Sequence, residues 1–125
     1  MVFSLKIQQR FGIYTKMKIE DLRQAIKKDT PIEYTAHCQK RMIERDISRE
    51  DLRNCIMVGE IIEDYPLDEG NNSENSFPCC LISGFKTDGD RIHIVVGYKG
   101  FKILMISACY PDKERWNEDF TKRRK

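Results

Sequence analysis

The stretch FPCCLISGFKTDGDRIHIVVGYKGFKILMISACY, residues 77–110, decides the fold class of this chain. It holds three runs that are rich in β-branched and aromatic residues, at 77–85, 91–98 and 101–110. The sequences DGD and KG separate these runs, and both are typical of tight turns. Because such turns join neighbouring strands, the stretch predicts three consecutive antiparallel strands.

Upstream of this stretch lies a shorter β-rich run, EIIEDY, at residues 60–65. A polar segment, LDEGNNSENS at residues 67–76, follows it and has the composition of a mobile loop. Residues 60–65 are therefore a candidate fourth strand of the same sheet.

The chain before residue 60 has the period of helices. In MKIEDLRQAIKKD, residues 17–29, isoleucine and leucine side chains recur on one face, and Pro31 ends the pattern. A second helix is predicted at about residues 36–45, with Thr35 as its N-cap.

A third predicted helix has the clearest boundaries. Ser48 is a good N-cap, Asp51 three residues later completes a capping box, and Gly59 ends the helix as a C-cap. Helices followed by an antiparallel meander indicate an α+β fold. We expect two to three N-terminal helices packed on a three- to four-stranded antiparallel sheet.

The 125 residues are expected to form one domain, at residues 17–125, behind an N-terminal extension at residues 1–16. In the tail, residues 111–125, the spacing of Trp116 and Phe120 predicts a short helix that packs back on the domain.

The composition is that of a soluble globular protein. Hydrophobic residues make up 40% of the chain, charged residues 34%, and the net charge is +2. No apolar run is long enough to span a membrane and the first residues lack a secretory signal, so a cytoplasmic location is expected. The five cysteines are odd in number and sit in apolar patterns, which favours reduced thiols. Without a CxxC or HxxxH pair, neither a metal site nor a cofactor is expected.

A histidine and two arginines share one helical stripe. In YTAHCQKRMIERDIS, residues 34–48, His37, Arg41 and Arg45 are four residues apart and fall on one side of the predicted helix. Two arginines on one stripe suit phosphate oxygens, and a neutral imidazole in the first helical turn suits a general base. The alternative is a structural salt-bridge network, because Glu44 lies between the arginines. Spacing alone leaves both interpretations open.

His93 is the other histidine of the chain. In RIHIVVGYK, residues 91–99, strand alternation places it with Arg91 and Lys99 on a mixed face, opposite the apolar core face. One interpretation is a groove to which Lys102 also contributes, and the other is an inert, half-exposed histidine. If the helices cover the core face, His93 points away from them, so the two histidines need not share one site.

The pattern Y-T-x-H-x3-R-M-x-E-R-x-I-S, carried here as YTAHCQKRMIERDIS, resembles the bacterial family known as domain of unknown function 4258. The likeness continues in GEIIE, CLISGF, RIHIVVGY and ISACYPDKERW and covers roughly residues 33–120. Such families resemble the RelE-like and MqsR-like toxins of toxin–antitoxin pairs, small α+β proteins that cut mRNA. The resemblance therefore implies a RelE-like fold and a small, zinc-finger type of antitoxin-like partner.

The resemblance also implies roles for particular residues. The catalytic candidates are His37, Arg41, Arg45 and His93, and Tyr110 is a substrate-binding candidate. Strand alternation and proximity to His93, and not the resemblance, add three further substrate-binding candidates: Arg91, Lys99 and Lys102. The implied reaction needs no metal: a histidine takes the proton of a 2′-hydroxyl, and the arginines stabilise charge on phosphorus.

One departure from RelE-like ribonucleases is the charge. Those proteins tend to be strongly basic, whereas this chain has a net charge of only +2. The sequence thus supports two hypotheses. One is a toxin-type endoribonuclease that binds mRNA or the ribosome, and the other is a non-catalytic protein-interaction or regulatory module with the same fold.

Overall fold

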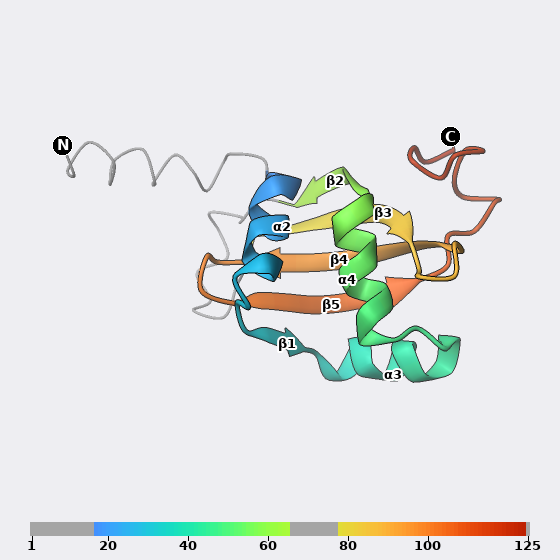
Figure 1. Ribbon diagram of the computed structural model, residues 1–125. Helices are drawn as coiled ribbons and strands as arrows, with labels where there is room; N and C mark the ends of the chain where they lie inside the picture. The colour runs from blue at the N-terminus through green and yellow to red at the C-terminus, as the bar shows by residue number, and fades with distance from the viewer. Residues whose placement is uncertain (1–16, 66–77, 125) are drawn as a thin grey trace, which may run out of the picture.

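The computed structural model of the chain describes residues 17–65 and 78–124 (Figure 1). The predicted extension at residues 1–16 and the predicted polar loop at residues 67–76 lie outside the described residues. The described part of the chain forms three helices and one five-stranded sheet. The predicted α+β class is confirmed.

The sheet has the strand order β1-β5-β4-β3-β2. Strands β2 (Glu60–Tyr65), β3 (Cys79–Phe85), β4 (Arg91–Tyr98) and β5 (Ile103–Cys109) form the predicted antiparallel meander. The strand β1 (Ile32–Tyr34), which the sequence did not indicate, pairs in parallel with β5. The sheet is therefore mixed, with one more strand than expected.

Two glycines allow the tight turns of the meander. Gly89 in the β3–β4 turn has a φ of 96°, and Gly100 in the β4–β5 turn has a φ of 90°. These are left-handed backbone conformations that residues with a Cβ atom rarely adopt. Both DGD and KG therefore act as the turns that the sequence predicts.

The helices begin and end where their local signals indicate. Thr35 caps α3 (Ala36–Arg45), and Ser48 with Asp51 forms the capping box of α4 (Arg49–Val58). Gly59 ends α4 without a positive φ; it is needed because a Cβ atom there would lie 2.6 Å from the carbonyl oxygen of Ser83. The predicted first helix is shorter than expected and forms α2 (Ile19–Lys27).

Helices α2 and α4 cover one face of the sheet, while α3 lies along the edge formed by β1 and β5 (Figure 1). The core fills the space between this face and the helices; its side chains include Leu22, Leu52, Ile82, Ile92 and Ile94. We call the opposite side of the sheet the back face. By strand register it carries Leu81, Ser83, His93, Val95, Ser107 and Cys109.

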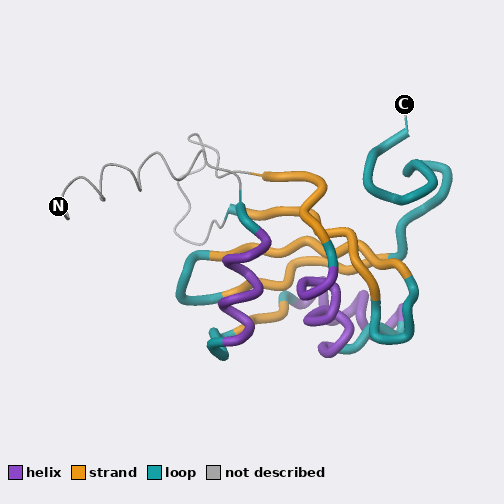
Figure 2. The backbone as a smooth tube through the Cα atoms, turned by 45° about the horizontal axis from the view of Figure 1, so that its top comes forward, coloured by secondary structure: helices purple, strands orange, loops and turns teal. Residues whose placement is uncertain are grey.

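The C-terminal segment is not the predicted helix. Residues 111–124 form turns and a single bridge between Trp116 and Arg123, and Figure 2 draws the segment as loop throughout. Phe120 has a φ of 59°, which a helix does not allow. The expected packing is nevertheless present, because Trp116 is only 6% exposed and contacts the back face through His93. No helix among the described residues is long and apolar enough to cross a membrane.

Candidate functional site

The start of α3 is fixed to strand β5. The backbone N–H of Thr35 donates to the carbonyl of Met105 at 3.0 Å, and its hydroxyl donates to the carbonyl of Ile106 at 3.0 Å. The same hydroxyl caps the helix by accepting from the N–H of Cys38 at 3.0 Å. One threonine thus sets both the beginning of the helix and its position against the sheet.

A β-bulge lies at the same point. Along β5, Ser107 is opposite Val95 and Met105 is opposite Val96, so Ile106 has no partner in β4. A bulge bends its strand and changes the direction of neighbouring side chains. The bulge here frees the carbonyl of Ile106 for Thr35 and keeps Ser107 on the back face, next to α3.

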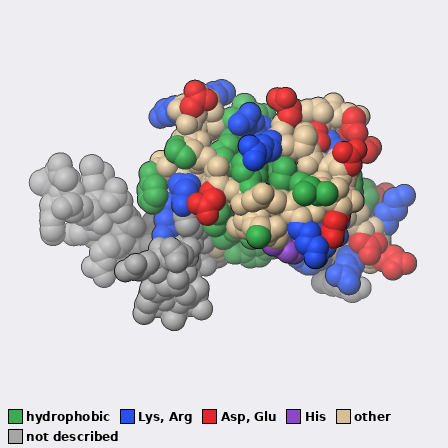
Figure 3. Space-filling model, turned by 90° about the horizontal axis from the view of Figure 1, so that it is seen from below, with side chains coloured by type: hydrophobic (Ala, Val, Ile, Leu, Met, Phe, Trp, Pro, Cys, Tyr) green, Lys and Arg blue, Asp and Glu red, His purple; other side chains and the backbone are tan. Residues whose placement is uncertain are grey.

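His37 stands in the first turn of α3 and is exposed. Its Nε2 lies 3.4 Å from the hydroxyl oxygen of Ser107, at the outer limit of a hydrogen bond. Because Ser107 belongs to the back face, His37 borders that face along β5. In Figure 3 a histidine is visible at the surface with Lys or Arg side chains beside it.

Among the described residues, the side chains of Arg41 and Arg45 each have one hydrogen-bonding partner. Nη1 of Arg41 forms a salt bridge with Glu44 at 2.9 Å, and Nη1 of Arg45 donates to the carbonyl of Ala108 at 3.1 Å. Each contact uses one of the five N–H donors of a guanidinium. The arginines therefore brace α3 and still present donors to a ligand, so the two interpretations of the stripe do not exclude each other.

The thiol of Cys109 lies within the electrostatic reach of these arginines. Burial raises its pKa, and the positive charges of Arg45 and Arg41 offset only part of this rise. A protonated thiol is a poor nucleophile. We therefore do not assign Cys109 as an attacking group; its electrostatic interaction with both guanidinium groups shows that they lie near the back face.

We call the group formed by His37, Arg41, Arg45, Ser107 and Cys109 the α3–β5 seam. Among the described residues no group of three or more His, Cys, Asp or Glu side chains could hold a metal ion. The seam offers an imidazole, a hydroxyl and two guanidinium groups. It can therefore bind an oxyanion and exchange a proton with it.

His93 is placed differently from the half-exposed position that the sequence suggested. It is 2% exposed, because Trp116 lies edge-on against its ring at a centroid distance of 4.6 Å. Its Nε2 donates to the carbonyl of Phe120 at 2.8 Å. Burial lowers the pKa of His93 more than this carbonyl raises it, so the imidazole is held neutral. The C-terminal segment thus covers the place where one of our two interpretations of His93 put a groove.

The four predicted substrate-binding residues separate into two pairs. Arg91 begins β4, where it donates to the Ser83 hydroxyl at 2.9 Å, and the Tyr110 hydroxyl donates to the carbonyl of Arg45 at 2.9 Å. Lys99 and Lys102 lie at the other end of β4, roughly 25 Å away at about 3.3 Å per strand residue. Lys102 forms a salt bridge with Glu33 there, at 2.8 Å. Only Arg91 and Tyr110 lie toward the seam.

Two residues of this region were missed by the sequence analysis. Ser107 is the polar residue in the otherwise apolar run ILMISAC, a signal that was available. Lys86 is 7% exposed and donates to the Tyr110 hydroxyl at 2.8 Å, a bond that raises the pKa of the lysine. Its position beside Tyr110 depends on the sheet register, which no local pattern indicates.

The family assignment rests on the same segment that builds the seam. The profile of the family described as "Domain of unknown function (DUF4258)" matches residues 34–110, from the end of β1 to Tyr110. The chain belongs to this family. Comparisons with curated proteins and with solved structures find no match. The DUF4258 match begins at the last residue of β1, spans α3, α4 and the whole meander, and therefore includes every residue of the seam.

Proposed function

We propose that this protein is a metal-independent endoribonuclease of the toxin type, resembling RelE-like and MqsR-like toxins, that cleaves mRNA in free or ribosome-bound form. The observation that carries the proposal is the α3–β5 seam. There an exposed histidine borders a sheet face, and Arg41 and Arg45 follow it at one-turn intervals along the helix. A base beside two permanent positive charges is what cleavage of an RNA phosphodiester requires.

In the proposed reaction His37 is the general base. We place the proton of the neutral imidazole on Nε2, which lies 3.4 Å from the Ser107 hydroxyl; this tautomer leaves Nδ1 to take the proton from a ribose 2′-hydroxyl. The 2′-oxygen attacks the adjacent phosphorus, the bond to the 5′-oxygen breaks, and that oxygen takes a proton from solvent. The products are a 2′,3′-cyclic phosphate and a 5′-hydroxyl end. The need for a 2′-hydroxyl makes RNA, and not DNA, the substrate.

His37 is preferred over His93 as the base because of access. His93 is 2% exposed, and its Nε2 is already bonded to the carbonyl of Phe120. A general base must come within hydrogen-bond reach of the proton that it removes. We therefore assign His93 to holding the C-terminal segment and His37 to the chemistry.

The charge that develops on phosphorus is met by groups at both ends of the seam. The backbone N–H of His37 lies in the first turn of α3, where no carbonyl of the helix can accept it and the helix dipole favours an anion. Arg41 and Arg45 supply charged donors further along the helix. With a net charge of only +2, binding depends on this local group, which contacts few phosphates, so we expect cleavage to weaken only moderately with added salt.

The test compares His37→Ala and Arg41→Gln with Lys40→Gln, a control that removes an exposed charge from the same helix. End-labelled RNA is incubated with each protein in excess chelator, and the product ends are mapped. We expect the two seam variants to lose activity by about 10²–10⁴-fold at nearly unchanged melting temperature, because one lacks the general base and the other a charge that stabilises the transition state. The Lys40 variant should cleave like the wild type.

The same proteins are then induced in a bacterial host at matched soluble levels. The proposal expects the wild type and the Lys40 variant to arrest growth, and the two seam variants not to arrest it. A His37→Ala protein that still cleaves, or an RNA with 2′-deoxyribose at the scissile position that is still cut, rejects it.

A second candidate function is a non-catalytic interaction module, and one observation favours it. Ile43 on α3 is 84% exposed, beside a shallow pocket that Met42 and Ile47 also line. An exposed large aliphatic side chain at an apolar hollow is typical of a protein-binding surface. The proposed partner is a small, zinc-finger antitoxin-like protein. This function would be favoured if the soluble wild type neither arrests growth nor cuts RNA. The wild type should then form a complex with such a partner, and Ile43→Asp should abolish that complex.

A further inference from the structure

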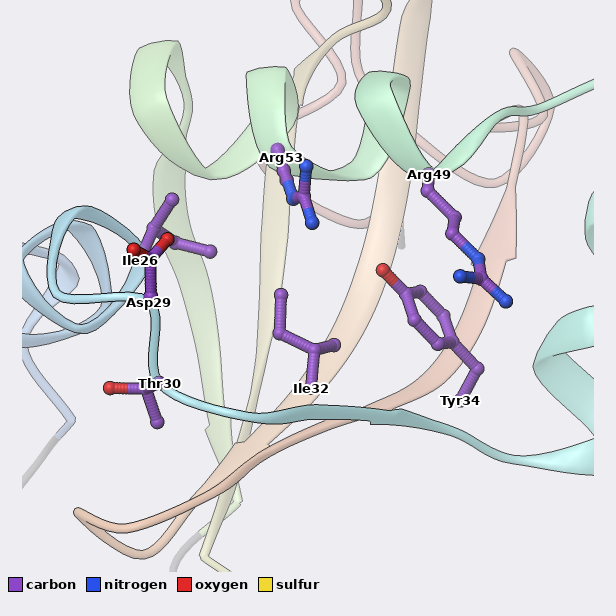
Figure 4. Close-up of a pocket in the computed structure, with 7 residues that line it drawn as sticks. All are labelled: Ile26, Asp29, Thr30, Ile32, Tyr34, Arg49 and Arg53. Carbon is purple, nitrogen blue, oxygen red and sulfur yellow. The ribbon is translucent and has the colours of Figure 1, made fainter.

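A second hollow lies on the helix-covered side of the sheet, away from the back face. It is a cavity of about 280 Å³ between the α2–β1 connection and helix α4 (Figure 4). Ile26 and Ile32 form its apolar part. Its polar part consists of Asp29, Thr30, Tyr34, Arg49 and Arg53. None of these residues belongs to the seam, so an argument about this cavity is independent of the proposed ribonuclease.

The hydroxyl of Tyr34 is the first sign of a ligand. Its oxygen is buried, and it is the one buried side-chain polar atom among the described residues that has no hydrogen-bond partner. Burial without a partner costs a hydroxyl its hydration without compensation, so native proteins rarely keep such a group. Figure 4 shows this hydroxyl directed into the cavity. A bound acceptor would satisfy it.

The two arginines are the second sign. Arg49 and Arg53 are four residues apart on α4, and neither forms a salt bridge with a described residue. The Arg49 guanidinium lies over the Tyr34 ring, 4.7 Å from its centroid. In Figure 4 the Arg53 guanidinium and the Tyr34 hydroxyl point into the same space above Ile32. A positive charge and an unused donor thus face one small volume.

We propose that this cavity binds a small organic oxyanion, a carboxylate or a phosphate group. The Tyr34 hydroxyl and the Arg53 guanidinium donate to its oxygens, and Arg49 adds charge while it fixes the Tyr34 ring. Ile26 and Ile32 contact the carbon skeleton. The carboxylate of Asp29, which also lines the cavity, accepts from a hydroxyl or amine at the other end of the ligand. A ligand with an anionic end and a hydrogen-bond donor fits this arrangement.

The test is a titration of isotope-labelled protein, followed by the amide NMR signals of the cavity residues. Inorganic phosphate and acetate are the two probes, and chloride keeps the ionic strength constant. We expect at least one probe to shift these signals in a saturable manner with millimolar affinity. Tyr34→Phe, which keeps the aromatic ring under Arg49, and Arg53→Gln should each weaken binding by about tenfold.

Arg115→Gln is the matched control, because Arg115 is exposed and distant in sequence from the cavity. It should bind like the wild type. Binding of phosphate alone identifies a phosphorylated ligand, and binding of acetate alone a carboxylate; both support the proposal. The proposal is overturned if neither probe produces saturable shifts. It is also overturned if both cavity variants bind as well as the wild type at unchanged melting temperature. Because RNA cleavage is measured separately, either proposal can fail alone.

Discussion

The two histidines of this protein border the same face of the sheet but lie in opposite surroundings. His37 lies on α3 beside Ser107 of β5 and is exposed. His93 lies on β4, the strand next to β5, and is 2% exposed beneath Trp116. Residue type does not distinguish them, and strand alternation alone does not indicate that His93 is covered. The difference comes from the C-terminal segment, which covers one histidine and leaves the other accessible.

This contrast shows how one face can serve two purposes. Around His93 the contacts are structural: Phe120 accepts from its ring, and Arg123 lies over the ring of Trp116 at 4.7 Å from the centroid. Around His37 the groups are exposed or only partly used. We therefore expect substitutions under the C-terminal segment to change stability, and substitutions in the seam to change activity.

The largest effect on stability is expected from Trp116→Ala. Removing this buried ring leaves a cavity over His93 and should lower the free energy of unfolding by about 3 kcal/mol, as loss of a buried aromatic side chain does. It should also let water reach His93 and raise its pKa toward the ordinary range. Urea denaturation and NMR titration measure these two quantities.

Phe101→Ala, at a position 67% exposed, is the control and should change stability little. If the Trp116 variant is as stable as this control, our assignment of His93 to holding the C-terminal segment is wrong.

A smaller effect is expected where the seam also braces the fold. Arg45→Gln removes the bond to the carbonyl of Ala108 and should cost about 1 kcal/mol, because the group is only partly buried. Arg41→Gln breaks a solvent-exposed pair with Glu44 and should cost at most about 0.5 kcal/mol. Urea midpoints of both variants test the order. If Arg41→Gln lowers the free energy of unfolding more than Arg45→Gln does, the stripe is chiefly an ion-pair network and not a phosphate-binding group.

The smallest expected effect is a pH dependence of stability that comes from His93. Burial lowers the pKa of His93, the nearby charges of Arg91 and Arg123 lower it further, and the Phe120 carbonyl and Glu63 partly offset this. The unfolded chain, with an ordinary histidine pKa of about 6.5, therefore takes up a proton before the folded protein does. Stability should be highest above about pH 6.5 and fall as the pH drops toward the lowered pKa.

Urea midpoints measured across this range test the assignment. In His93→Gln this part of the pH dependence should disappear, whereas His37→Gln should keep it. A pH dependence that survives in the His93 variant would contradict the burial argument.

The parts of the fold that sequence predicted well are those with local causes. Thr35 caps α3, and Ser48 with Asp51 caps α4, because each contact joins residues three positions apart. The same holds for the turns at Gly89 and Gly100. Pattern reasoning also placed His37, Arg41 and Arg45 on one stripe of α3, since helical geometry alone requires it.

The parts that sequence did not predict depend on distant contacts. The strand β1 is three residues long and becomes a strand only because β5 pairs with it. The C-terminal segment has helical spacing, but the side chains of Asp112, Asn117 and Asp119 accept backbone N–H groups and form turns instead. Because that segment covers the back face, the burial of His93 could not be read from strand alternation.

The bond from Thr35 to Ile106 has a consequence for the order in which the chain folds. Thr35 and Ile106 are 71 positions apart. Ala108, which accepts a hydrogen bond from Arg45 at the other end of α3, comes near the end of β5. During synthesis the nascent chain emerges from its N-terminus, so α3 leaves the ribosome long before the strand that anchors it. Closing so long a loop is slow compared with forming a helix. The histidine that we assign to catalysis therefore acquires its surroundings only after strand β5 has been synthesised.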